Sequence, residues 1–200
     1  MGHRFDPANV ARLEDPARLS WQAPAVVIGL LDLKGDETVI DFGAGSGVYT
    51  LPLAEALPLG RVLAVDLSSE LLEVLRGKLS RRPDLAPRVE LVQSTEQRVP
   101  LNDALADAIV AVNMWHEVHD ERASVDEVVR LLAPGGRLLS VDWAPIDRPV
   151  GPPNDTVLSV TQSRDSIGGL GLELVAVYDA RELFPYHHAL LARKPDTTVR

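Results

Sequence analysis

Hydrophobic residues along the chain fall into short runs that alternate with longer amphipathic stretches. The short runs are typical of buried strands and predict them near residues 38–42, 61–65, 88–92, 107–112, 136–142, 172–178 and 186–193. The amphipathic stretches predict helices near residues 21–31, 48–57, 68–80, 121–132 and 156–168. This alternation favours an α/β fold with a doubly wound, mostly parallel seven-stranded sheet.

The last two predicted strands are joined by a short polar link with no room for a crossover helix. They should therefore pair antiparallel, as a hairpin at the C-terminal edge of the sheet. We expect a single domain over residues 1–200, with a core at 34–200 and a helical lid at 1–33. The alternative for the lid is a helix that only covers a sheet face. The proline-rich segment 144–155 follows the fifth strand and should also open onto the site.

Composition and charge narrow the class of protein. The chain is 46% hydrophobic, contains no cysteine and carries a net charge of −9. No apolar run is long enough to span a membrane and no signal peptide is recognisable, so we expect a cytoplasmic protein with no membrane partner. The basic group of Arg76, Lys78, Arg81 and Arg82 is interpreted as a solvated helix end, and no basic face for nucleic acid is present.

A glycine-rich turn follows the first predicted strand. Asp41 is followed by Gly43, Gly45 and Gly47, and a helical pattern begins directly afterwards. In the dinucleotide fingerprint G-x-G-x-x-G the sixth position is glycine, whereas here it is Val48. An acid before the turn would repel a pyrophosphate and attract a cation. The spacing therefore favours a cationic nucleoside cofactor over a dinucleotide.

The pattern Asp41-x-Gly43-x-Gly45-x-Gly47 resembles the first motif of the class I S-adenosylmethionine-dependent methyltransferases. The run Pro134-Gly135-Gly136 before the fifth predicted strand is similar to a recurrent turn of the same family. The resemblance covers roughly residues 20–195. It implies a Rossmann-like methyltransferase fold, S-adenosylmethionine as the cofactor and methyl transfer to a small molecule. It also implies that the glycine turn wraps the methionine part, with Asp41 near its amino group.

Further cofactor contacts are implied at the ends of the next strands. The resemblance places Asp66, at the end of the strand 61–65, on the two ribose hydroxyls; alternatively Asp66 only starts a turn. After the strand 88–92 the family often has an acid for adenine, and here Ser94 stands there. The residues assigned to the cofactor are Asp41, Gly43, Ala44, Gly45, Gly47, Asp66, Leu67, Ser94, Thr95, Glu96 and Asn113.

Candidate catalytic residues follow the strand 107–112, because ligands of doubly wound sheets bind beyond the carboxyl ends of strands. His116 is the first candidate for a general base, since imidazole titrates near neutral pH, and Glu117 is the second. The alternative for His116 is a packing role. We expect no metal site: His187 and His188 alternate sides of a strand and cannot easily face one ion.

The remaining question is the acceptor. Trp21, Trp115 and Trp143 favour an apolar or aromatic small molecule. Two other functions stay open from the sequence: a non-catalytic S-adenosylmethionine-binding regulator and a nicotinamide-dependent oxidoreductase on a similar sheet. Turnover separates the first from an enzyme, and cofactor binding separates the second.

Overall fold

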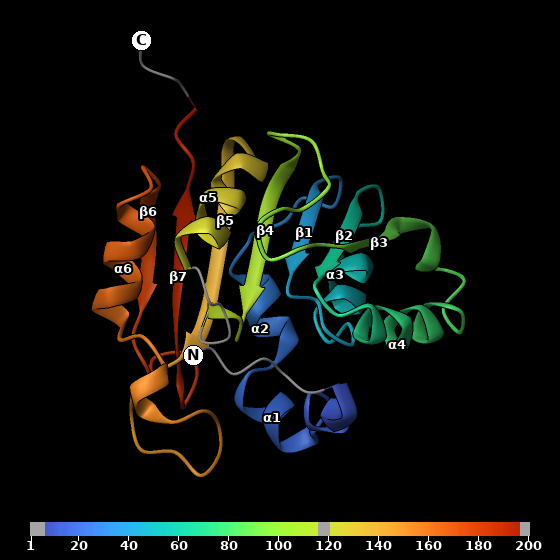
Figure 1. The fold of residues 1–200 in the computed structure, drawn as a ribbon. Helices are drawn as coiled ribbons and strands as arrows, with labels where there is room; N and C mark the ends of the chain where they lie inside the picture. Colours follow the sequence, from blue (N-terminus) through green and yellow to red (C-terminus); the bar gives the residue numbers. More distant parts are fainter. Residues whose placement is uncertain (1–6, 116–120, 197–200) are drawn as a thin grey trace.

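The fold is a seven-stranded sheet with helices on both faces, described here from a computed structural model (Figure 1). The structure describes residues 7–115 and 121–196. The strands are β1 (Thr38–Phe42), β2 (Arg61–Asp66), β3 (Val89–Gln93), β4 (Ala106–Val112), β5 (Leu132–Trp143), β6 (Glu173–Tyr178) and β7 (His187–Arg193). The main helices are α1 (Pro16–Trp21), α2 (Pro24–Gly29), α3 (Thr50–Ala56), α4 (Ser69–Leu79), α5 (Glu121–Leu131) and α6 (Val160–Gly168).

The strand order is β3-β2-β1-β4-β5-β7-β6. The pairs from β3 to β5 are parallel, whereas β7 runs antiparallel to both β5 and β6. The predicted fold class and the C-terminal hairpin are therefore confirmed. The order reverses between β1 and β4, and the crevice beyond such a reversal is where doubly wound sheets bind ligands.

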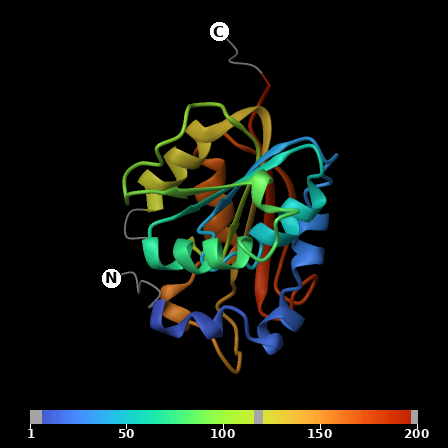
Figure 2. The same cartoon turned by 90° about the vertical axis from the view of Figure 1, so that its right-hand side faces the viewer.

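Two hydrophobic clusters hold the helices against the sheet. Side chains of α2, α3 and α4 pack on one face, and side chains of α5 and α6 pack on the other. Figure 2 shows α2 and α3 on the side of the sheet opposite α5. Central strands are buried on both faces, which explains why their sequences read as continuous apolar runs.

The N-terminal region differs from the single helix predicted over 21–31. Two short helices, α1 and α2, replace it, because Pro24 disfavours helical backbone at the residue before it and opens a new helix. Both views show α1 at the same end of the molecule as the loop that follows β5 (Figures 1 and 2). This end lies beyond the carboxyl ends of the parallel strands.

Two other elements begin four residues away from their predicted start, while the remaining boundaries differ by two residues or fewer. β5 begins at Leu132 rather than 136, because Leu132 pairs with Ala106 before the register shifts around Gly135. α6 begins at Val160 rather than 156, because Ser159 and Gln162 form a capping box that fixes the helix start.

Candidate cofactor and acceptor site

The glycine turn connects β1 to α3 in a backbone conformation that requires glycine. Gly43, Gly45 and Gly47 have φ of 82°, 55° and 88°, all in the left-handed region. A Cβ on Gly47 would lie 2.3 Å from Leu75 Cδ1, within the core under the turn. The backbone amides of Gly43 and Ala44 both donate to the carbonyl oxygen of Val65, each at 2.9 Å, so β2 holds the turn in place.

Asp41 lies under this turn. Its side chain is 2% exposed, and its Oδ2 accepts a hydrogen bond from Thr50 Oγ1 at 2.5 Å. Burial, together with the charge of Asp66, raises the pKa of Asp41 to about 7. A buried carboxyl without a cationic partner among the described residues favours its protonated form, and a cation bound nearby would favour the carboxylate.

Asp66 ends β2 and binds the same turn. Its Oδ2 accepts from the backbone amide of Gly45 at 2.7 Å, and its Oδ1 accepts from Ser68 at 2.8 Å. Burial raises the pKa of Asp66, and these backbone donors oppose the rise. Two bonds leave acceptor capacity on an ionised carboxylate, which has about four lone-pair sites. The carboxyl of Asp66 can therefore accept further hydroxyl donors.

The polar residues after β3 lie beside Asp66. The backbone amide of Ser94 donates to the carbonyl oxygen of Asp66 at 3.0 Å, so the ends of β2 and β3 are tied together. Thr95 Oγ1 accepts from the Arg98 amide at 3.0 Å and closes a local turn. Glu96 and Leu67 are exposed at this edge.

Asn113 follows β4 and adopts a φ of 54°, a conformation that asparagine tolerates better than most residues. Its Nδ2 donates to Gln22 Oε1 at 2.8 Å, and Gln22 is fully buried between α1 and α2. Tyr49 Oη donates to the carbonyl oxygen of Gln22 at 3.3 Å. These bonds join the N-terminal helices to the ends of β4 and the glycine turn, although Gln22 carries no recognisable signal in the sequence.

A second connection joins the N-terminal segment, residues 7–33, to the glycine turn. Lys78 Nζ of α4 binds Glu14 Oε1 at 2.7 Å and the carbonyl oxygen of Ser46 at 2.6 Å. Leu13 approaches the same turn, since its Cδ1 lies 3.4 Å from the position of a Cβ on Gly45. The interpretation of the basic group as only a solvated helix end is therefore wrong for Lys78.

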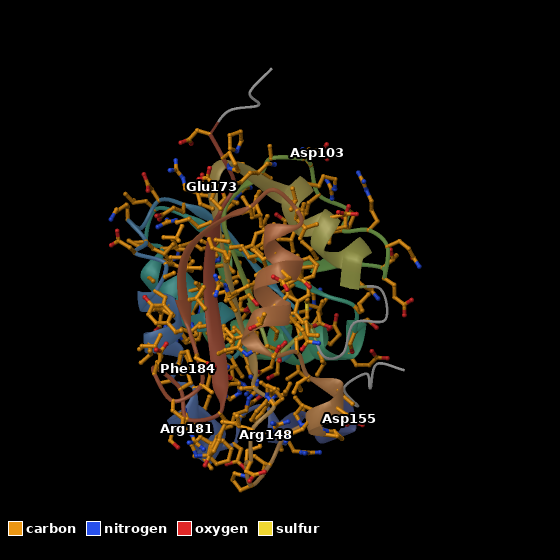
Figure 3. All side chains as sticks on the ribbon, turned by 90° about the vertical axis from the view of Figure 1, so that its left-hand side faces the viewer. Asp103, Arg148, Asp155, Glu173, Arg181 and Phe184 are labelled. Atoms are coloured by element: carbon orange, nitrogen blue, oxygen red, sulfur yellow. The ribbon has the colours of Figure 1, made fainter. Side chains whose placement is uncertain are left out.

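Aromatic residues gather where β5 ends and β7 begins, at the same carboxyl edge of the sheet as the glycine turn. Trp21 of α1 meets Tyr186 edge-to-face, with ring centroids 5.3 Å apart. Trp143, the last residue of β5, lies against His187, the first residue of β7, with centroids 4.1 Å apart. We call Trp21, Trp143, Phe184, Tyr186 and His187 the aromatic cluster. Figure 3 places Phe184 at the same end of the molecule as Arg148, opposite Asp103 and Glu173.

Arg148 shapes the loop 144–155 beside this cluster. Its guanidinium donates to the carbonyl oxygens of Ala144 and Ile146 at 2.5 and 3.1 Å, to Asn154 Oδ1 at 2.6 Å, and to the carbonyl oxygen of Pro152. It also lies 5.3 Å from the Trp143 ring centroid. No sequence pattern indicates this role, because most of the acceptors are main-chain oxygens of an irregular loop.

The third tryptophan lies elsewhere. Trp115 Nε1 donates to Ser140 Oγ and its amide to Asp142 Oδ2, each at 2.8 Å, so this side chain is held against β5. The two catalytic candidates, His116 and Glu117, lie outside the described residues. Within the described ranges, no cluster of three potential metal ligands is found. No helix in the same ranges has the length and apolar character needed to cross a bilayer.

The glycine turn and its acids fit a cationic nucleoside cofactor. The turn carries three glycines in left-handed backbone, so no side chain projects from these positions. Asp41 supplies a buried carboxyl that a cation would ionise, and Asp66 supplies free acceptor capacity for hydroxyls. This donor and acceptor set suits the expected S-adenosylmethionine.

Comparison with known proteins agrees with this reading. A family model described as a methyltransferase domain matches residues 40–140. An uncharacterized methyltransferase of Mycobacterium tuberculosis is 36% identical over 137 residues, which are 68% of this chain and 48% of that protein. The demethylmenaquinone methyltransferase of Thermus thermophilus is 28% identical over 142 residues, 71% of this chain and 62% of that protein.

A solved structure extends the similarity over nearly the whole chain. The S-adenosylmethionine-dependent methyltransferase from Aquifex aeolicus superposes with a TM-score of 0.87 and 29% identity, covering 95% of this chain and 99% of that chain. The curated M. tuberculosis relative is longer, and this chain spans about half of it. The chain therefore belongs to the class I S-adenosylmethionine-dependent methyltransferases, and S-adenosylmethionine is its cofactor.

Proposed function

We propose that this chain transfers the methyl group of S-adenosylmethionine to a small aromatic acceptor. The acceptor is bound between the N-terminal segment and the part of the carboxyl edge of the sheet where β5 ends and β7 begins, called here the β5–β7 edge. One observation carries the proposal: the same segment contacts both halves of the edge. Lys78 ties Glu14 to the glycine turn, Gln22 bonds to Asn113, and Trp21 meets Tyr186. A segment that contacts both halves would enclose the cofactor and the acceptor together. These contacts support the role of residues 1–33 as a lid over the core at 34–200.

The geometry of the turn supports the proposed cofactor contacts. Gly43, Ala44, Gly45 and Gly47 surround the methionine part, with Asp41 near its amino group. Asp66 accepts from the ribose hydroxyls with the lone pairs that its backbone donors leave unused. The remaining contacts, toward the base and the reacting end, are assigned to Leu67, Ser94, Thr95, Glu96 and Asn113.

The work left to the protein is alignment and exclusion of water. S-adenosylmethionine, when bound, supplies an activated methyl group on its sulfonium. The N-terminal segment and the loop 144–155 close the edge, so the acceptor is held in line in a dry space. If the acceptor must lose a proton, His116 and Glu117 are the proposed general bases, in that order.

The acceptor class rests on the aromatic cluster. Trp21, Trp143 and Tyr186 bring aromatic rings together at the half of the edge that the cofactor residues do not occupy. The T. thermophilus relative is named as a demethylmenaquinone methyltransferase, and the ring system in that name agrees with a flat acceptor.

Turnover tests the proposal. The purified chain is incubated with S-adenosylmethionine and a panel of small phenols, naphthols and quinols, and formation of S-adenosylhomocysteine is measured. We expect turnover that Asp66→Ala lowers at least tenfold at limiting cofactor, and that Glu173→Ala leaves unchanged. Glu173 is an exposed acid at the opposite end of the molecule (Figure 3). Saturable cofactor binding without turnover on any acceptor would instead support a non-catalytic regulator.

A further inference from the structure

His187 is a buried polar side chain whose hydrogen-bonding groups are unused. It is 1% exposed, and neither Nδ1 nor Nε2 has a hydrogen-bond partner within the described part of the chain. Buried side-chain polar atoms are hydrogen-bonded in the large majority of cases, so two unpaired nitrogens on one ring require an explanation. Nothing in the cofactor assignment uses this residue.

The position of His187 points toward the acceptor. It pairs with Trp143 in the β5–β7 ladder, so it lies beyond the carboxyl end of the parallel strands. Its ring is tilted by 36° against Trp143 and meets the ring of Phe184 at 88°. The unpaired nitrogens are therefore set among aromatic faces at the ligand-binding edge.

The neighbouring histidine shows what a structural role looks like in this strand. His188 lies on the opposite face, where its Nε2 is 3.0 Å from Ser163 Oγ of α6. That contact ties β7 to the helix that covers it. His187 makes no equivalent bond, although the two residues are adjacent and equally buried.

The surroundings of His187 keep its ring neutral. Burial lowers the pKa of His187 to about 3. The charge of Asp142 acts against this shift, while the positive charges of Arg18 and Arg148, and of His188 when it is protonated, add to it. A neutral imidazole carries one donor and one acceptor nitrogen. It can therefore either donate to an oxygen or accept from a hydroxyl.

We propose that His187 recognises the methyl acceptor, by a hydrogen bond between its imidazole and a hydroxyl carried on the acceptor's aromatic ring. The inference rests on the proposed function, in which the acceptor lies at this edge. α1 lies over the same edge, because Trp21 contacts Tyr186 and the charge of Arg18 acts on His187. Displacement of α1 gives the acceptor access to the ring, and the bond makes His187 a specificity-determining residue.

The test compares two ligands that differ only in the hydroxyl. Binding of 1-naphthol and of naphthalene is measured by tryptophan fluorescence, with S-adenosylhomocysteine present so that no turnover occurs. We expect the wild-type chain to bind 1-naphthol about 10-fold more tightly than naphthalene, and His187→Phe to bind both equally. His187→Phe keeps a ring against Trp143 and removes only the unpaired nitrogens. His187→Gln, which keeps a polar group, should recover part of the discrimination.

The control is His188→Phe, which removes the contact to Ser163. It should lower the melting temperature and retain the preference for 1-naphthol. Equal binding of the two ligands by the wild-type chain, or an unchanged preference in His187→Phe, would overturn the inference. S-adenosylmethionine titration of each variant confirms that it is folded. Failure of turnover on every acceptor is a separate result and would overturn the proposed function instead.

Discussion

The two halves of the ligand-binding edge are built in different ways. At the glycine turn, Asp41 and Asp66 are hydrogen-bonded, and the backbone of the turn is held by β2. At the β5–β7 edge, both nitrogens of His187 are buried without a partner within the described ranges. The first half is held in shape by its own hydrogen bonds, although Ser46 Oγ within the turn is buried without a partner among the described residues. The second half differs because it carries two unpaired nitrogens on one aromatic ring, which a ligand could satisfy.

This difference suits two separate tasks, the binding of the cofactor and the recognition of the acceptor. A cofactor that is always the same molecule can be bound by a rigid turn, whose shape is set by residues adjacent in the sequence. An acceptor must be recognised by its own polar groups, and buried atoms that lack partners discriminate strongly for ligands that pair with them. If the two halves act independently, a change in one half should leave the function of the other intact.

The largest expected effect is on the rigid half. Gly47→Ala places a Cβ in left-handed backbone and 2.3 Å from Leu75 Cδ1. We expect a loss of about 2–4 kcal/mol in the free energy of unfolding, measured by urea denaturation. Gly77→Ala in α4 is the control, because nothing lies within 4 Å of its Cβ; it should be neutral or slightly stabilising. Equal stability of the two variants would contradict the account of the turn.

The second effect is on the acceptor half and depends on pH. The folded pKa of His187, about 3, lies below the ordinary value of about 6.5 for histidine, so the unfolded chain binds more protons below pH 6.5. Stability is therefore lost as pH falls from about 6.5 toward 3, by at most about 1.4 kcal/mol per pH unit.

His187→Phe removes this contribution, and the difference in unfolding free energy between variant and wild type should grow in favour of the variant as pH falls. Other groups cancel in that difference, including His188, whose pKa burial also lowers. A difference that stays constant from pH 7 to 5 would show that His187 is not held neutral.

The third effect links the cofactor to Asp41. With a pKa of about 7, this carboxyl is largely protonated in the free protein at pH 6. A cofactor ammonium near Asp41 should ionise it, so binding should release close to one proton at pH 6 and fewer at pH 8.

Calorimetric titration in buffers of different ionisation enthalpy measures this release. Asp41→Asn should abolish it and weaken S-adenosylmethionine about tenfold. A binding enthalpy that does not depend on the buffer at pH 6 would place the cation elsewhere.

The smallest effect concerns the N-terminal segment. Lys78→Met removes the ion pair with Glu14 and the bond to Ser46, and should cost about 1 kcal/mol while increasing the dissociation rate of S-adenosylmethionine a few-fold. Arg76→Met on the same helix breaks the exposed pair with Glu73, which does not involve the N-terminal segment, and should change neither quantity. Identical dissociation rates in the two variants would show that the N-terminal segment does not retain the cofactor.

Local sequence was sufficient to predict most of the fold and the glycine turn, while the cofactor contacts assigned to that turn stay a prediction. The glycine spacing, the apolar central strands and the acid after β2 each depend on adjacent residues, so periodicity and turn chemistry were sufficient to predict them. The second half depends on contacts between distant parts of the chain. Trp143 meets His187, Gln22 meets Asn113 and Lys78 meets Glu14 only after folding, and no local pattern predicts these pairings.

The most direct test of the account is calorimetric titration with S-adenosylmethionine, and with NAD and NADP in parallel, of the wild type, Asp66→Ala and His187→Phe. We predict saturable binding of S-adenosylmethionine alone, at least tenfold weaker in Asp66→Ala and unchanged in His187→Phe. Binding that Asp66→Ala leaves intact, equal weakening in both variants, or saturable binding of a nicotinamide cofactor would contradict the division of this edge into a cofactor half and an acceptor half.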